Sequence, residues 1–303
     1  MASPPLTVLI PTHGRPALLE RTLDSIAQCT LPDGYEELVV IENGSREGAE
    51  HLVEALPKRL NARYMHRERG NKSYALNEAL ETIDDGLVVF FDDDVRVHSS
   101  TLVRYSEAAQ RRKGRKVYFG GPVEVDREDE SPKWFESFLP SSARGYEVGP
   151  SRRRKWYLGF NWAAFRSDIE RLGGFDPRFG PGAPSRSTGQ ESDMQARMRG
   201  DGMQPVDVQG ARVTHYVPEE NCTLSWLLKR RYRGGIRSGI ELDMNALSFA
   251  GRIVWQTAVS FGVAGKGALR ADREKVAFTL FNFFERIGVV KGYVWQSMNG
   301  DRR

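Results

Sequence analysis

The sequence has little cysteine, with Cys29 and Cys222 the two among 303 residues. Their spacing fits no zinc site, and two thiols do not build the disulfide framework of a small secreted domain. The N-terminal residues lack a basic region followed by a long apolar core, so we expect no secretory signal. These absences favour a soluble or peripheral protein of a reducing compartment. We expect a cytoplasmic location, with contact to the inner face of the cell membrane as an additional option.

Long apolar runs and two common phosphate-binding motifs are also missing. The stretch at 253–265, IVWQTAVSFGVAG, is interrupted by Gln256, Thr257 and Ser260 and is too short to span a bilayer. The chain has no G-x-x-x-x-G-K-[ST] loop, and no G-x-G-x-x-G follows an apolar run. The two nucleotide folds that depend on these loops therefore lose support.

No strong excess of charge of one sign is present, since the formal net charge is +4. Residues 244–303 hold nine Lys or Arg against four acids, which leaves about −1 for the first 243 residues. This balance argues against nucleic acid as a partner and allows a membrane face to meet the basic end of the chain. With 40% hydrophobic residues, the chain is long enough for one large domain with an appendage.

Apolar runs alternate with amphipathic segments along the first 120 residues. The runs at 6–10, 36–42, 62–67 and 86–91 predict strands, and the segments at 17–28, 47–58, 72–83 and 100–112 predict helices. Strict alternation implies right-handed crossovers and a mostly parallel sheet, whose ligand site lies beyond the carboxyl ends of its strands. Polar motifs stand at those ends: PTHGRP after the first strand, ENGS after the second and DDD after the fourth.

The pattern loosens into an α+β half from residue 117 to 215. This half includes a helix at 190–202, a strand at 211–217 and a Gly/Pro/Ser loop at 173–189. Because the loop has little side-chain mass to anchor it, we expect a mobile lid there. A basic helix follows at 223–237, and the last sixty residues predict two amphipathic helices.

Three aspartates, Asp92, Asp93 and Asp94, end the fourth apolar run. The simplest interpretation is a solvated turn that also caps the helix near Ser99. At the end of a buried strand, however, three carboxylates repel one another unless a cation compensates them. Oxygen ligands suit magnesium or manganese. The run therefore predicts a metal ion together with a nucleotide diphosphate.

Seven ordered segments carry a family resemblance. They are TVLIPTHGRPALLERTLDSI, VVIENGS, GNKSYALNEAL, VVFFDDDV, GFNWAAFRSDIERLGGFDPRFG, GQESDMQARMRGDG and ARVTHYVPEE. In this order they resemble family-two glycosyltransferases with the GT-A fold, over about residues 5 to 240. The resemblance implies an α/β fold with a Rossmann-like nucleotide-sugar-binding half (1–120), an acceptor half (121–243) and a C-terminal amphipathic helical region (244–303).

The resemblance also implies which residues bind the nucleotide. Pro11, Thr12 and Arg15 would contact the nucleoside, and Glu42 would accept a hydrogen bond from the base. The family usually has aspartate where this chain has Glu42, so the side chain reaches one methylene further. A turn and helix cap at 43–45 is the other interpretation of that segment. Lys72 would meet a phosphate, or else lie solvated in the first turn of its helix.

The aspartate run matches the D-x-D motif of the family. Asp92 would face the ribose or sugar with Asp93 beside it, and Asp94 would bind Mn²⁺ or Mg²⁺ at the diphosphate. His215 matches a histidine that often supplies another metal ligand, although a lone histidine at a strand end is more often structural.

The segment GQESDMQAR supplies two candidates for the catalytic base, Glu191 and Asp193. An acceptor hydroxyl must lose a proton as it attacks, so a carboxylate is needed near it. The family usually reads Glu-Asp where this chain has Gln190-Glu191, which makes Glu191 the expected base and Asp193 its rival. Both residues also suit the first turn of a helix.

The segment GFNWAAF would lie under the donor sugar, with Gly159, Asn161 and Trp162 as contacts. A tryptophan in an apolar run is also a common core residue. The basic run at 152–155 is either a solvated loop or a clamp for a phosphate-bearing acceptor.

These features predict an inverting, metal-dependent glycosyltransferase. It would use a nucleotide-diphosphate sugar, UDP-linked, and a glycan, lipid-linked or other hydroxyl acceptor. Two alternatives are a sugar-phosphate nucleotidyltransferase and a non-catalytic glycan- or nucleotide-binding module. Residues 244–303 would either pack against the catalytic domain or lie on an anionic membrane surface.

Overall fold

A computed structural model describes residues 3–112, 114–129, 131, 133–149, 156–251, 253, 255 and 273–299. The chain divides into two compact units. Unit 1 comprises Met1–Glu128, Pro140–Gly182 and Gln190–Val217, and unit 2 comprises Asp129–Leu139, Ala183–Gly189 and Pro218–Arg303. The boundary expected at residues 243 and 244 lies inside unit 2 and stays a prediction.

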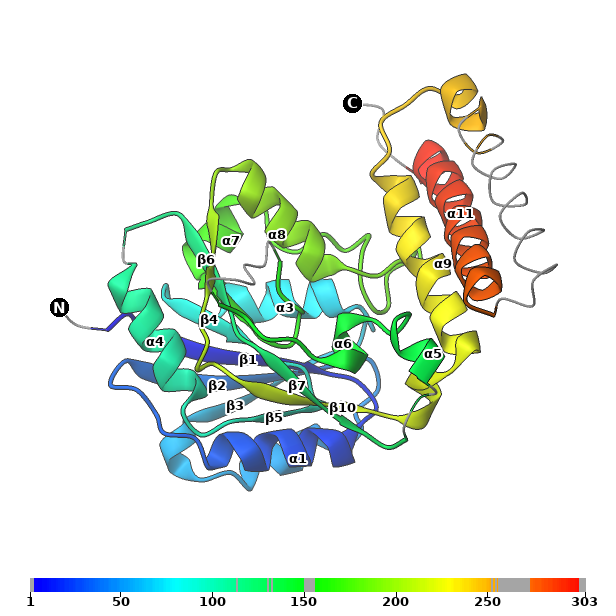
Figure 1. The fold of residues 1–303 in the computed structure, drawn as a ribbon. Helices are drawn as coiled ribbons and strands as arrows, with labels where there is room; N and C mark the ends of the chain where they lie inside the picture. Colours follow the sequence, from blue (N-terminus) through cyan, green and yellow to red (C-terminus); the bar gives the residue numbers. More distant parts are fainter. Residues whose placement is uncertain are drawn as a thin grey trace. The chain divides into compact units, whose positions relative to one another are not determined.

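A seven-stranded sheet in the order β3-β2-β1-β4-β8-β6-β9 forms the centre of unit 1 (Figure 1). Its strands are β1 (Leu6–Thr12), β2 (Tyr35–Asn43), β3 (Ala62–Arg67), β4 (Leu87–Phe90), β6 (Val117–Gly120), β8 (Trp162–Phe165) and β9 (Gln204–Asp207). Adjacent strands from β3 to β4 pair in parallel, and β8 runs antiparallel to β4 and to β6. The expected mixed, mostly parallel sheet is confirmed.

All four helices expected in the first 120 residues are present. The helices of unit 1 are α1 (Pro16–Ala27), α2 (Ala49–Glu54), α3 (Lys72–Glu81), α4 (Thr101–Arg111), α6 (Ser141–Arg144), α7 (Arg166–Arg171) and α8 (Gln190–Gly200), with a short 3₁₀ helix η1 (Lys58–Leu60). Pro16 begins α1, where its fixed φ suits a first turn. Asn71 caps α3, its side chain accepting a hydrogen bond from the Tyr74 N–H at 3.1 Å.

Both faces of the sheet are buried, as the continuous apolar runs of its strands require. Val8 and Ile10 of β1 lie on the face covered by α1 and α4. Leu9 lies on the opposite face, in the cluster that includes side chains of α3 and α8. Burying one such side chain contributes about 1.5–3 kcal/mol, so the two layers hold the strand ends in place.

A second, three-stranded sheet in the order β5-β10-β7 follows directly from the aspartate run. Its strands are β5 (Val95–Val97), β7 (Val123–Arg127) and β10 (Val213–Val217). Strand β5 was not expected, because three residues carry too little pattern to predict a strand. Two α1 hydroxyls hold it: the N–H of Val95 donates to Thr22 Oγ1 at 3.2 Å and that of Val97 to Ser25 Oγ at 2.9 Å.

The expectation of an unanchored lid is wrong for residues 173–182. Phe175 and Phe179 are each 1% exposed and fix the segment to the core of unit 1. The Asn77 side chain also accepts from the N–H of Phe175 at 2.7 Å and donates to its carbonyl at 2.8 Å. The high content of glycine and proline predicted a loose loop, but Phe175, Phe179 and the Asn77 side chain hold this segment in place.

Unit 2 contains the helices α5 (Lys133–Glu136), η2 (Glu219–Cys222), α9 (Leu224–Ile240) and α11 (Arg273–Asn299). Glycines allow α9 and α11 to pack closely: a Cβ at Gly288 would lie 2.1 Å from the Tyr232 carbonyl, and one at Gly235 2.0 Å from that of Glu285. The basic helix and the second terminal helix are confirmed, and the first terminal helix lies largely outside the described residues. Among the described helices, none combines the length and apolarity needed to cross a bilayer.

Candidate active site

The carboxyl ends of β1, β2 and β4 bring the predicted nucleotide residues together. Thr12 pairs with Glu42 across β1 and β2, and Leu9 pairs with Phe90 across β1 and β4. Thr12 and Asp93 each lie three residues beyond that second pair. The Thr12 hydroxyl accordingly donates to Asp93 Oδ2 at 2.7 Å.

Two cations of the chain pair with the aspartate run. Arg15 donates to Asp93 and, at 2.8 Å, to Asp94 Oδ2. Lys72 Nζ lies 2.5 Å from Asp92 Oδ1, and although burial opposes the charged form, Asp92 raises the pKa of Lys72. Side-chain cations of the chain thus offset part of the charge for which the sequence predicted a metal ion and a diphosphate. Arg15 contacts the aspartates, and nothing in these contacts tests its expected role at a nucleoside.

Asp93 is the buried member of the run, with 1% of its side chain exposed. Burial raises the pKa of Asp93 to about 6, an effect that Arg15 opposes. Both of its oxygens have partners, Thr12 and Arg15. Asp93 thus ties the end of β1 to the segment after β4, with one protein partner on each of its oxygens.

Asp94 and His215 face each other with no hydrogen bond between them. His215 Nε2 lies 3.6 Å from Asp94 Oδ1, a buried oxygen without a hydrogen-bond partner. His215 Nδ1 lies 2.8 Å from the Ser142 carbonyl, which favours a proton on Nδ1 and a lone pair on Nε2. A carboxylate oxygen and an imidazole nitrogen at this distance could both ligate one divalent cation. No group of three such ligands occurs among the described residues, so the remaining ligands would be donor phosphates or water.

The pairing of β5 with β10 creates this juxtaposition. His215 pairs with Val95, the residue after Asp94, and the Tyr216 N–H donates to the Asp94 carbonyl at 2.9 Å. Phe160 stacks on the imidazole with ring centroids 4.3 Å apart. The Ser142 carbonyl and the Phe160 ring orient His215, and neither contact was predicted from the sequence.

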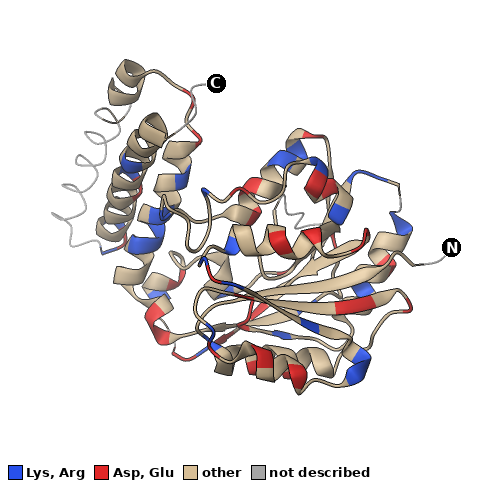
Figure 2. Cartoon of the chain, turned by 180° about the vertical axis from the view of Figure 1, so that it is seen from behind, with Lys and Arg blue, Asp and Glu red and all other residues tan. Residues whose placement is uncertain are grey.

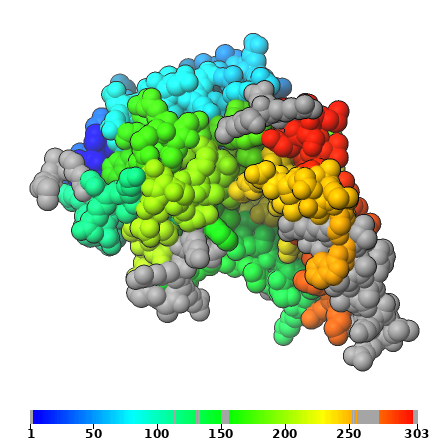
Figure 3. All heavy atoms as spheres, turned by 90° about the horizontal axis from the view of Figure 1, so that it is seen from above, coloured from blue at the N-terminus to red at the C-terminus, as the bar shows by residue number. Residues whose placement is uncertain are grey.

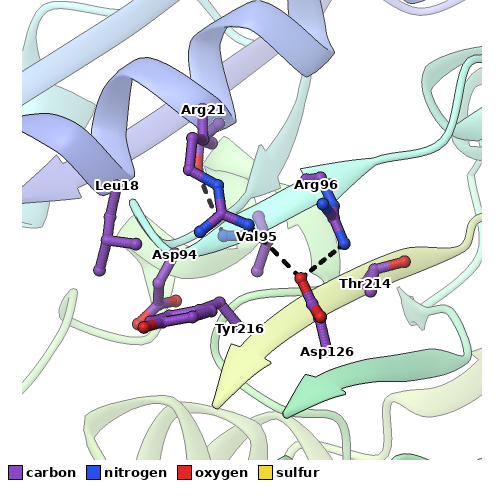
Figure 4. A pocket seen from close by; sticks show the side chains of 9 residues that line it. Leu18, Arg21, Asp94, Val95, Arg96, Asp126, Thr214 and Tyr216 are labelled. Atoms are coloured by element: carbon purple, nitrogen blue, oxygen red, sulfur yellow. Dashed lines mark hydrogen bonds and ion pairs between the residues drawn. The ribbon is translucent and has the colours of Figure 1, made fainter. Parts of the chain in front are cut away.

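A small pocket lies behind Asp94, lined by side chains of α1, β5, β7 and β10 (Figure 4). Arg21 and Arg96 both reach Asp126, at 3.4 and 2.7 Å. The guanidinium of Arg21 also lies 5.0 Å from the centre of the Tyr216 ring. These two cations are therefore engaged with Asp126 and leave Asp94 to Arg15 and His215.

Glu42 closes the turn after β2. It is 2% exposed, and its oxygens accept from the Glu47 N–H and the Tyr64 hydroxyl, each at 2.6 Å. The turn interpretation of this segment thus has direct support in the contacts. The longer side chain, where the family usually has aspartate, is what reaches both donors. Its role at the base stays a prediction.

The two candidate bases have different surroundings. Asp193 Oδ2 accepts from Arg197 at 2.7 and 3.0 Å, and Arg197 also donates to the carbonyls of Leu172 and Gly174. Glu191 instead lies beside Gly159 and, with Lys72 and Asp92, lines a crevice of about 10 Å³. Asp193 therefore anchors α8, whereas Glu191 faces the aspartate run.

Gly159, Asn161 and Trp162 were expected under the sugar. Gly159 lines the crevice and, as a glycine, presents only its backbone there. Asn161 is fully buried, donating to the carbonyls of Pro122 and Ala211 at 2.9 Å and accepting from the Tyr105 hydroxyl at 2.8 Å. Trp162 is 1% exposed and stacks on Phe90, so it reaches the crevice only from the core side. Pro11 also lines the crevice, and the basic run at 152–155 lies outside the described residues.

Comparison with known proteins decides the family. Residues 7–168 match the model for glycosyl transferase family 2. The chain is 30% identical over 262 residues to the succinoglycan biosynthesis protein ExoM of Rhizobium meliloti (strain 1021), a match that covers 84% of this chain and 80% of that protein. The chain belongs to glycosyl transferase family 2. The nucleotidyltransferase and the non-catalytic module are thereby not supported.

Further family 2 relatives match in part. A GalNAc(5)-diNAcBac-PP-undecaprenol beta-1,3-glucosyltransferase of Campylobacter jejuni is 28% identical over 162 residues, which covers 51% of this chain and 48% of that enzyme. Among solved structures, the mannosyltransferase PcManGT of Pyrobaculum calidifontis, in complex with GDP-Man and Mn²⁺, has a TM-score of 0.61. It is 19% identical, with 98% of this chain and 88% of that chain covered.

GalNAc-T7, solved with UDP, GalNAc and Mn²⁺, has a TM-score of 0.54 at 16% identity and covers 78% of this chain and 51% of that chain. Identities this low show the fold alone, and together with the mixed sheet they confirm the GT-A fold. Both neighbours were solved with Mn²⁺.

Gly159→Ala tests the contact between the crevice wall and Glu191 in this family 2 enzyme. The new Cβ would lie 3.2 Å from Glu191 Cγ and 3.3 Å from Cδ, so the carboxylate must shift by a few tenths of an ångström. We expect the rate of glycosyl transfer to fall by roughly tenfold or more, because misplaced catalytic groups lose rate steeply. The unfolding free energy should change by less than about 1 kcal/mol.

Gly200→Ala is the matched control on the same helix as Glu191, since a Cβ there meets nothing within 4 Å. It should keep the wild-type rate. A Gly159→Ala enzyme with unchanged kcat would contradict the assigned contact.

Proposed function

We propose that this family 2 enzyme is an inverting, metal-dependent glycosyltransferase. Its donor is a nucleotide-diphosphate sugar, UDP-linked, and its acceptor is a hydroxyl of a glycan or lipid-linked glycan. One observation carries the proposal: Glu191 lines the same crevice as Asp92, the first residue of the aspartate run, and Asp94 at the end of the run faces His215. The acceptor class is supported by the names of the R. meliloti and C. jejuni relatives, a succinoglycan biosynthesis protein and a glucosyltransferase of an undecaprenol-linked glycan.

Direct displacement requires a base for the acceptor and charge compensation for the leaving group. Glu191 takes the proton from the acceptor hydroxyl as its oxygen attacks the anomeric carbon. Arg15 and Lys72 offset the negative charge that grows on the departing diphosphate. Asp94 and His215 would hold the divalent cation, which adds electrostatic stabilisation of the same leaving group.

Donor binding involves an exchange of partners. In this structure Lys72 and Arg15 are paired with Asp92, Asp93 and Asp94, and the crevice has room for about one water molecule. A diphosphate offers Arg15 and Lys72 new oxygens, and Asp94 and His215 would then hold a divalent cation. Because such a cation would balance the charge of the diphosphate, the net charge of the site would change little on donor binding.

Replacing each candidate base separates their roles. Glu191→Gln should lower the rate of transfer by about 100-fold or more with donor affinity retained, because only proton removal is lost. Asp193→Asn should keep most of the rate but lower the unfolding free energy by about 1 kcal/mol, because Arg197 loses its ionised partner. Steady-state kinetics and urea unfolding of both variants measure this. If Asp193→Asn showed the larger loss of rate, Asp193 would be the base.

Substitution of Asp94, whose Oδ1 faces His215 Nε2, tests metal dependence. Mn²⁺ together with a UDP-sugar should raise Tm, and a ligand at 100 times its Kd adds about 2.7 kcal/mol to stability. Asp94→Asn should abolish the part of this shift that requires Mn²⁺. Asp126→Asn, a neighbouring carboxylate engaged with Arg21 and Arg96, should retain it. Equal shifts in wild type and Asp94→Asn would exclude Asp94 as a ligand.

We further propose that unit 2 contacts an anionic membrane surface through one face of α11. Exposed apolar side chains recur along this face at three- and four-residue intervals: Val276, Leu280, Phe283, Ile287, Val290, Val294 and Met298. Blue Lys and Arg segments mark both α9 and α11 in Figure 2. An apolar stripe with basic neighbours matches the chemistry of an anionic headgroup layer.

Flotation with vesicles containing anionic lipid tests this surface. Wild-type protein should float, and the double variant Phe283→Ser with Ile287→Ser should float several-fold less, since buried apolar area drives interfacial binding. Leu247→Ser, which removes an exposed apolar side chain outside α11, is the control. Equal flotation of all three proteins would remove the membrane contact from the proposal.

A further inference from the structure

A wide groove in unit 1 runs between α4 and β9, the edge strand of the seven-stranded sheet. It has a volume of about 1430 Å³ and is lined by α4, by the start of β6 and by residues 199 and 203–210. In Figure 3 the blue-green atoms of α4 and the yellow-green atoms of this later segment are neighbours on the face shown. The volume exceeds the roughly 300–1,000 Å³ of a small-molecule pocket, so the groove suits an extended ligand.

Cations dominate the lining of this groove. Six Lys or Arg line it, and Glu107 and Asp207 are the acids among the lining residues. The cations are Arg104, Arg111, Arg112, Arg115, Lys116 and Arg199. Such a surplus in a concave surface concentrates positive potential and attracts anions.

The local acids leave part of this charge uncompensated. Glu107 is shared by Arg104 and Arg111, at 3.1 and 4.0 Å. Asp207 accepts from the Tyr157 hydroxyl at 2.8 Å. The exposed side chains of Arg112 and Arg115 form no ion pair with the described part of the chain.

An exposed aromatic ring contacts Arg199, one of these cations. Trp156 is 54% exposed, and the guanidinium of Arg199 lies 5.6 Å from the centre of its ring. A ring of this kind offers a flat apolar surface on which a sugar ring stacks, while guanidinium groups bind carboxylates in bidentate fashion. Stacking and anion binding together favour a ligand that is both a carbohydrate and an acid.

The direction of β9 relates the groove to the active site. Strand β9 is parallel to β6, and β6 and β4 are both antiparallel to β8. The carboxyl end of β9 therefore points to the same edge of the sheet as the end of β4, where the aspartate run lies. A chain lying along β9 leads toward that edge.

We propose that this groove binds an acidic glycan, a chain of sugars bearing carboxylates, at a site separate from the catalytic crevice. The site goes beyond the proposed transfer reaction, and its glycan class rests on that proposal. Arg112 and Arg115 bind the carboxylates, and Trp156 stacks on a sugar ring. The groove thereby holds a part of the glycan that does not react.

Calorimetric titration without donor or metal ion tests the site, so its failure leaves the transfer reaction untouched. The probes are an oligogalacturonate and a neutral maltooligosaccharide of equal length, at low ionic strength. The full-length protein should bind the acidic oligosaccharide saturably and the neutral one at least tenfold more weakly. Arg112→Glu with Arg115→Glu should weaken acidic binding by about tenfold or more. Trp156→Ala should weaken it several-fold.

Lys229→Glu with Arg233→Glu is the matched control, because it reverses two exposed cations of α9 in unit 2 and should bind as wild type does. Equal binding of both oligosaccharides, or an unchanged affinity in the Arg112 and Arg115 double variant, would overturn the proposal. So would tighter binding of single-stranded DNA or phosphatidylglycerol vesicles through the same two arginines.

Discussion

Three negative charges at the end of β4 set the requirements for everything around them. Each aspartate has different partners. Asp92 pairs with Lys72, and Asp93 binds Arg15 and Thr12. Asp94 also pairs with Arg15, but one of its oxygens has no hydrogen-bond partner. Because the middle residue is buried and bonded on both oxygens, it fixes the positions of its two neighbours. The outer aspartates then differ from each other in what they can bind.

This arrangement resolves an apparent conflict between stability and ligand binding. An uncompensated cluster of carboxylates would destabilise the fold, whereas a permanently neutralised cluster would have no use for a metal ion. Lys72, largely buried, and Arg15, about half exposed, compensate the cluster through side-chain cations, and we propose that both turn to a phosphate when the donor binds. Asp94 Oδ1, which faces His215 Nε2, is the oxygen of the run that stays buried without a hydrogen-bond partner in the described part of the chain.

The sequence predicted the parts of the fold that repeat over many residues. Strands and helices of the first 120 residues were confirmed because their apolar periodicity extends over whole elements. Strand β5 has three residues, too few for a recognisable pattern, and was not predicted. Without its pairing to β10, the sequence offered no geometric reason to place Asp94 next to His215. Asn161 was expected at the sugar because a motif gives position in the chain and not the direction of a side chain. Its amide turns inward to bind two carbonyls.

A single short segment, residues 157–160, contacts both Glu191 and His215. The Gln195 side chain of α8 accepts from the Tyr157 N–H at 2.8 Å and donates to its carbonyl at 3.1 Å, which ties the segment to the helix that carries Glu191. Two residues later Gly159 abuts Glu191, and the next residue, Phe160, stacks on His215. Consecutive residues thus touch Glu191 and His215, the residues that we propose as base and metal ligand. The bare backbone of Gly159 leaves room for Glu191, because a Cβ there would lie 3.2 Å from Glu191 Cγ, and the ring of Phe160 sets the plane of the imidazole.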